Sequence, residues 1–196
     1  MIWWYAALVA IGAATVLAIL AAALKRDWLA LPAVPVVLGA LALRLAGVTP
    51  PADQWFAPLL VIGLLSLATA GGGPLVTFVL RAIVKTPQKA GEHGGIVLAD
   101  RERDEPAKLK NTKKRGRAGQ EVLRGGATIG YLERFALVGA VLVGQPAAVA
   151  IIVAVKGLGR FTELDSAAAR ERFIVGTLGS LIWAATCATV IAGTWA

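Results

Sequence analysis

Charged side chains in the apolar C-terminal part of the chain are the residues best suited to chemistry. They are Glu133, Arg134, Lys156, Arg160 and Glu171. Charge at membrane depth is costly, so such residues are usually paired with one another or functional. Lys156 and Arg160 are one helical turn apart on the same face, where two cations suit a phosphate or a carboxylate. The pattern indicates a ligand-binding site for an anion, a proton or a lipid headgroup.

Glu133 and Lys156 also predict an ion pair. Glu133 precedes Gly144 by as many residues as Lys156 follows Gln145. If the chain turns at these two residues, the acid and the base lie at the same depth on adjacent helices. An ion pair that only fixes two helices together is the alternative to a ligand site, and the sequence leaves both open.

A helical hairpin would bring these charges together. Residues 135–155 carry no charge and are consistent with one membrane span. However, glycine is favoured just beyond the end of a helix and proline at its first position, as in Gly144-Gln145-Pro146. We therefore favour a hairpin at about residues 128–161. Its helices, 128–143 and 146–161, would each be about 24 Å long.

The composition places the hairpin in an all-α, polytopic integral membrane protein. Hydrophobic residues make up 57% of the chain, and the mean hydropathy is +0.70. About six transmembrane helices fit this length. Residues 1–84 are predicted to form a three-helix membrane region, and residues 85–127 a basic, largely disordered loop. Residues 128–196 supply the hairpin and the last helix of the same membrane domain.

The third apolar segment, residues 55–84, is too long for one regular span. Gly71, Gly72, Gly73 and Pro74 interrupt it, and each weakens a helix. One interpretation is a kink or an interfacial re-entry. The other is a discontinuous helix with free backbone groups that face a solute.

The net charge of +8 predicts orientation more than it predicts nucleic-acid binding. Basic residues gather on the cytoplasmic side of membrane proteins. The loop 85–127 is therefore expected in the cytoplasm of a bacterium, with both termini outside its plasma membrane. Four tryptophans then fall at the outer interface: Trp3, Trp4, Trp55 and Trp195. The basic loop is expected to attract anionic lipid headgroups.

No catalytic residue, metal site or cofactor is predicted. The single cysteine, Cys187, excludes an intramolecular disulfide, and His93 has no second ligand nearby. A small transporter-like, channel-like or anion-binding protein is favoured over a lipid-modifying enzyme. A structural subunit is the alternative, because stripes of small residues suit a partner helix or a second copy. One such stripe is Gly176, Ser180, Ala184 and Ala188.

Several short motifs resemble a known membrane-protein family. They are Gly130-Tyr131-Leu132-Glu133-Arg134, Gly144-Gln145, Ala154-Val155-Lys156-Gly157, Arg160-Phe161, Glu171 and Gly176-Thr177-Leu178-Gly179-Ser180. Together they are similar to the bacterial and phage family called domain of unknown function 3307, and to related actinobacterial proteins, over about residues 126–185. The resemblance implies membrane residence and singles out Glu133, Lys156, Arg160 and Glu171, but it implies no activity. Gly157 replaces the family's serine, and the family's N-terminal histidine and aspartate motif is absent.

Overall fold

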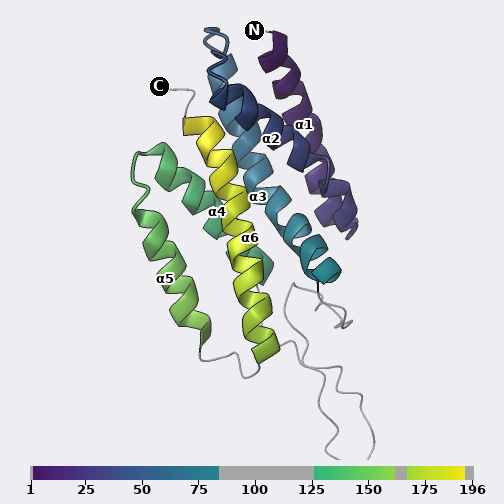
Figure 1. The fold of residues 1–196 in the computed structure, drawn as a ribbon, viewed down its shortest axis with the longest axis vertical. Coiled ribbons are helices and arrows are strands. Elements are labelled where there is room, and N and C mark those ends of the chain that lie inside the picture. The colour runs from purple at the N-terminus through teal and green to yellow at the C-terminus, as the bar shows by residue number, and fades with distance from the viewer. Residues whose placement is uncertain (1, 84–125, 162–166, 193–196) are drawn as a thin grey trace, which may run out of the picture.

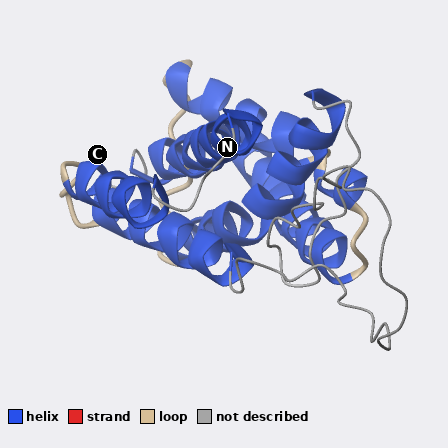
Figure 2. Ribbon diagram, turned by 90° about the horizontal axis from the view of Figure 1, so that it is seen from below, coloured by secondary structure: helices blue, strands red, loops and turns tan. Residues whose placement is uncertain are grey.

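The described part of the chain is a bundle of helices joined by turns (Figure 1). The computed structural model describes residues 2–83, 126–161 and 167–192. Within these ranges there is no strand (Figure 2), which confirms the all-α prediction. The elements are α1 (Ile2–Ala23), the short 3-10 helix η1 (Asp27–Ala30), α2 (Ala33–Leu45), α3 (Phe56–Ile83), α4 (Gly126–Leu142), α5 (Ala148–Phe161) and α6 (Ala167–Ala192).

Four stretches are long and apolar enough to cross a membrane. They are Ile2–Ala23, Asp27–Leu45, Phe56–Ala82 and Arg170–Ala192. The other two helices are shorter, at 17 residues for α4 and 14 for α5. At 1.5 Å per residue they reach about 26 and 21 Å, less than the roughly 30 Å of a bilayer's hydrocarbon core. The described residues therefore support four spanning helices by length and composition.

Helices α3 and α6 form the centre of the bundle. Helix α3 packs against α1, α4 and α6, whereas α5 packs mainly against α4 at one side (Figure 1). The buried face of α3 includes Leu60, Leu64 and Leu67, which recur at helical spacing. They pack in one apolar core with residues of α1, α2, α4 and α6. This core fixes how the polar side chains of α4 and α6 meet α3.

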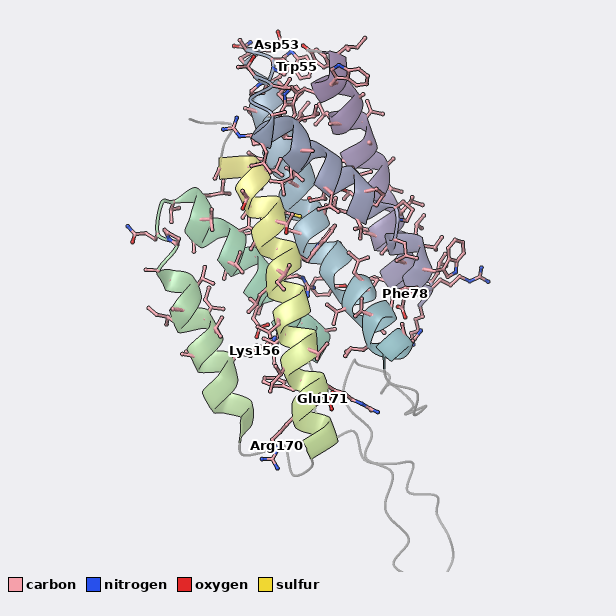
Figure 3. All side chains as sticks on the ribbon, in the orientation of Figure 1. Asp53, Trp55, Phe78, Lys156, Arg170 and Glu171 are labelled. Carbon is pink, nitrogen blue, oxygen red and sulfur yellow. The ribbon has the colours of Figure 1, made fainter. Side chains whose placement is uncertain are left out.

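Aromatic residues pack together at the end of the bundle where α1 begins and α6 ends (Figure 1). The indole nitrogen of Trp4 donates to the carbonyl of Val48 at 2.9 Å. The Tyr5 hydroxyl donates to the carboxylate of Asp53, and the Tyr5 ring packs against Trp55 (Figure 3). Trp4 and Trp55 thus share one end, as expected of interface residues. Trp195 lies outside the described residues.

The turn between α4 and α5 follows the predicted glycine and proline pattern. Gly144 has a φ of +71°, a left-handed conformation that suits glycine. The amide of Gln145 donates to the carbonyl of Ala140 at 2.8 Å, which closes the last turn of α4. Helix α5 begins two residues after Pro146. The hairpin is confirmed, and the alternative of one span across residues 135–155 is wrong.

Helix α3 runs without interruption through Gly71, Gly72, Gly73 and Pro74. The discontinuous-helix interpretation of these residues is therefore wrong. An apolar environment penalises every backbone group that a break would leave unbonded. The 28 residues of α3 reach about 42 Å. Two of the glycines, Gly71 and Gly72, instead leave room for side chains from α6 and α4, as described below.

Candidate functional site

Arg134 is a charged side chain buried at the centre of the bundle, with 4% of its surface exposed. It lies near the middle of α4 and reaches between α3 and α6. Its Nε donates to the carbonyl of Thr69 at 2.9 Å, and its Nη1 donates to the Ser180 hydroxyl at 3.1 Å. Its guanidinium carbon lies 5.1 Å from the centre of the Tyr131 ring, in cation–π range. One cation thereby connects three helices.

Arg134 has no ion-pair partner among the described residues, although the neighbouring Glu133 carboxylate attracts its charge at longer range. No carboxylate of those residues lies within 4.0 Å of its guanidinium nitrogens. A guanidinium has five N–H donors. The structure gives Arg134 one hydrogen bond from Nε and one from Nη1, both to neutral acceptors. Its Nη2 donates to none of the described residues, so not every N–H group of the guanidinium is bonded to them.

Glycines make room for this arginine. A Cβ added to Gly72 would lie 2.6 Å from Cδ and 2.9 Å from Nε of Arg134. A Cβ on Gly130, one turn earlier in α4, would lie 3.2 Å from Nη1. At Gly73 the nearest arginine atom would be Nη2 at 3.9 Å, an ordinary contact. Gly72 is the point where the arginine crosses α3.

Trp183 of α6 packs against the same stretch of α3. A Cβ on Gly71 would lie 3.3 Å from its ring. Its indole nitrogen donates to the carbonyl of Leu67 at 3.2 Å. Two polar side chains from two helices thus bond to main-chain carbonyls of α3, where small residues let helices approach closely.

Glu133 and Lys156 form the predicted ion pair between α4 and α5. Their side chains are 11% and 15% exposed, so both charges are largely removed from solvent. The two charges neutralise each other, and the pair holds α4 and α5 together away from the turn that joins them. The anion-site hypothesis requires Lys156 to be a free cation, but Lys156 is paired with Glu133.

The four candidate charges whose side chains the structure describes do not form one cluster. Arg134 follows Glu133 directly, and successive residues of a helix point about 100° apart. Glu133 consequently faces α5, whereas Arg134 faces α3 and α6. Glu171 is exposed near the start of α6, beside Arg170 (Figure 3). The side chain of Arg160 lies outside the described residues.

Ser180 and Gly72 belong to the site but were not singled out for it from the sequence. Ser180 stands in the small-residue stripe of α6, with Ala184 and Ala188, and all three are buried. The stripe predicts packing, which is confirmed. Ser180 carries the one hydroxyl of the stripe, and this residue type could have indicated a hydrogen-bonding role, because a buried hydroxyl needs a partner.

Metal chemistry gains no support from the described residues. They contain no group of three His, Cys, Asp or Glu side chains able to hold a metal ion. Cys187 is buried in the core. Comparison of the chain with protein-family models, with curated proteins and with solved structures finds no match.

Proposed function

We propose that this chain is an integral membrane protein that binds an anion at Arg134. The ligand is a phosphate or carboxylate group, carried by a lipid headgroup or by a small solute. The observation that carries the proposal is a guanidinium that is 4% exposed, has no carboxylate partner among the described residues and keeps Nη2 unbonded to them.

Electrostatics favours an anion at this position. An isolated charge in a medium of low dielectric constant is costly, and a nearby opposite charge offsets that cost. The planar fork of arginine matches the two oxygens of a phosphate or a carboxylate. Gly73 and Gly130 present no side chain toward Nη2; a Cβ there would lie 3.9 and 3.8 Å from this nitrogen.

The Glu133–Lys156 pair has a supporting role in this proposal. It holds α5 against α4 and keeps the hairpin closed at the depth of the neighbouring Arg134. The sequence-based hypothesis made Lys156 one of the cations that contact the ligand. In the present proposal Arg134 replaces it as the cation that the ligand contacts.

We further propose a six-pass topology in a bacterial plasma membrane, with α4 and α5 crossing as a short pair. The basic loop 85–127 then lies in the cytoplasm. The distribution of charge supports this orientation, since Lys25 and Arg26 follow the end of α1 and Arg81 lies in the last turn of α3, and both helices end opposite the start of α1 (Figure 1).

A binding experiment on purified protein tests the anion site. The protein is reconstituted in phosphatidylcholine nanodiscs, and ligands are titrated while thermal unfolding is followed. One arm uses inorganic phosphate and the other a short-chain anionic phospholipid, which separates a soluble ligand from a headgroup. Stabilisation by either ligand is expected. Arg134→Gln should weaken binding about tenfold to a hundredfold, the usual value of a charged hydrogen bond.

Two further variants make the result interpretable. Arg170→Gln, at an exposed cation near the start of α6, changes the net charge as Arg134→Gln does and should keep ligand binding. Arg134→Lys keeps the charge but loses the fork, and should bind more weakly than the wild type. If neither ligand stabilises the wild-type protein, Arg134 is a purely structural residue and the proposal is wrong.

A further inference from the structure

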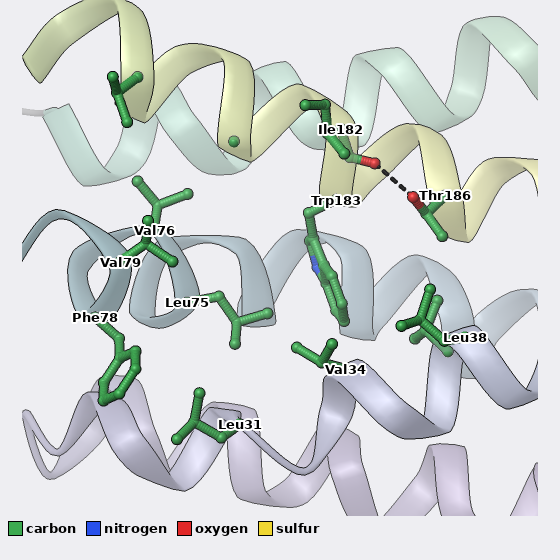
Figure 4. A pocket seen from close by; sticks show the side chains of 13 residues that line it. Leu31, Val34, Leu38, Leu75, Val76, Phe78, Val79, Ile182, Trp183 and Thr186 are labelled. Carbon is green, nitrogen blue, oxygen red and sulfur yellow. Dashed lines mark hydrogen bonds between the residues drawn. The ribbon is translucent and has the colours of Figure 1, made fainter. Parts of the chain in front are cut away.

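A second feature of the bundle, an apolar groove, lies on the side of α3 and α6 that faces α2 (Figure 4). Its volume is about 340 Å³. Its lining includes Leu31, Val34, Leu38, Leu75, Phe78 and Trp183. The groove is open at the surface of the bundle, since its lining residues Leu38 and Val79 are 53% and 45% exposed. Arg134 does not line it.

The lining offers hydrocarbon and no free polar group. The Thr186 hydroxyl donates to the carbonyl of Ile182 in its own helix at 2.8 Å, as Figure 4 shows. The indole nitrogen of Trp183 donates to Leu67 on α3. An occupant of the groove must therefore be apolar along its length, because a polar ligand would lose its hydrogen bonds to water without replacement.

The length of the groove suits a hydrocarbon chain. Along α6 the lining extends from Val175 to Thr186, about 16 Å. One leaflet's hydrocarbon depth is about 15 Å, half of the bilayer core.

Cations surround one end of the groove. Phe78 lies one helical turn before Arg81, and Leu31 follows the turn that carries Lys25 and Arg26. Lys25 and Arg26 are exposed. The side chain of Arg81 is 63% exposed although one of its nitrogens lies 2.5 Å from the Asp27 carboxylate. Among the described residues of η1, its preceding turn and the end of α3, three cations accompany one anion, Asp27, and on α6 Arg170, Glu171 and Arg172 precede Val175.

We propose that the groove binds one acyl chain of an anionic phospholipid, whose phosphate contacts Arg26 and Arg81. The lipid comes from the leaflet at the basic end, and its chain reaches the middle of the bilayer along α6. This site lies where α3 and α6 face α2, whereas Arg134 reaches α3 and α6 from α4 and does not line the groove, so the site does not depend on that proposal.

Fluorescence quenching of Trp183 tests the groove directly. The protein is reconstituted in phosphatidylcholine bilayers that contain increasing fractions of a lipid brominated near the middle of its acyl chains. The Trp183 signal is the difference between the wild type and Trp183→Phe. Brominated phosphatidylglycerol should quench this signal at an at least fivefold lower fraction than brominated phosphatidylcholine, since each nearby cation favours an anionic lipid about fivefold.

Matched variants separate the headgroup contact from the chain contact. Arg26→Gln should reduce the preference for phosphatidylglycerol about fivefold. Arg44→Gln, at the other end of α2, should not change it. Val79→Phe fills the groove and should reduce quenching by both lipids, whereas Val9→Phe on the exposed face of α1 should not.

Three results would overturn the proposal: equal quenching by the two lipids, no quenching of Trp183 at all, or the same loss in Arg44→Gln as in Arg26→Gln. The wild type and Trp183→Phe together decide between the first two and the expected result, even if another variant fails to fold. Arg134→Gln should leave Trp183 quenching unchanged, so failure of one site does not imply failure of the other.

Discussion

Arg134 crosses α3 over Gly72 so closely that a methyl group on Gly72 would lie 2.6 Å from its Cδ. The guanidinium then continues past α3 to Ser180 on α6. The position of the buried charge is therefore set by the absence of a side chain on a neighbouring helix. This relationship makes the adjacent glycines of α3 unequal, although they are identical in the sequence.

Gly72→Ala should lower the melting temperature of the detergent-purified protein. Overpacking of a fitted contact costs about 1–3 kcal/mol. Gly73→Ala is the matched control, because its Cβ would meet only Nη2 at 3.9 Å. That control should be neutral or stabilising by up to about 1 kcal/mol, since alanine favours a helix over glycine. Equal effects of the two substitutions would contradict the crossing.

Reversal of either charge in the Glu133–Lys156 pair should destabilise the hairpin by about 3–5 kcal/mol, because two like charges are left largely buried together. Reversing both together, as Glu133→Lys with Lys156→Glu, should recover much of that loss. Chemical denaturation of the four proteins measures the coupling. Strictly additive losses would show that the two residues act independently.

Ser180→Ala removes the neutral acceptor of Nη1 and leaves a buried donor unbonded. The expected cost in free energy of unfolding is about 1–3 kcal/mol. Thr186→Val on the same helix is the comparison, since that hydroxyl bonds to its own helix. Its effect should stay within about 0.5 kcal/mol. A Ser180→Ala protein as stable as the wild type would mean that the arginine does not depend on this bond.

Orientation can be tested by cysteine labelling in a Cys187→Ala background. A cysteine at Gln145, exposed in the hairpin turn, should react with an impermeant maleimide added to intact bacterial cells. A cysteine at Arg26, exposed at the opposite end, should react only after the cells are permeabilised. The opposite pattern would invert the predicted orientation.

Local patterns predicted the hairpin and its ion pair. Gly144 and Pro146 favour a turn by backbone conformation alone, and a turn there fixes which residues of α4 and α5 share a depth. Glu133 and Lys156 follow from that geometry without knowledge of the rest of the fold.

Contacts between distant segments were less predictable. The stretch from Gly71 to Pro74 has the same composition whether it breaks a helix or admits a neighbour's side chain, and only the packing of α4 and α6 decides. Similarly, Glu133 and Arg134 are adjacent in sequence but face different helices. The sequence alone does not show that Glu133 forms an ion pair with Lys156, whereas Arg134 is buried on neutral acceptors.

The acceptors on α3 have a genetic consequence. Arg134 and Trp183 bond to the carbonyl oxygens of Thr69 and Leu67, which every amino acid supplies. No substitution at residue 67 or 69 deletes these acceptors. A mutational scan should therefore find both positions tolerant of apolar exchanges of similar size. Intolerance should concentrate at Gly72, Arg134 and Trp183, where the shape of the helix surface or the donor itself is lost.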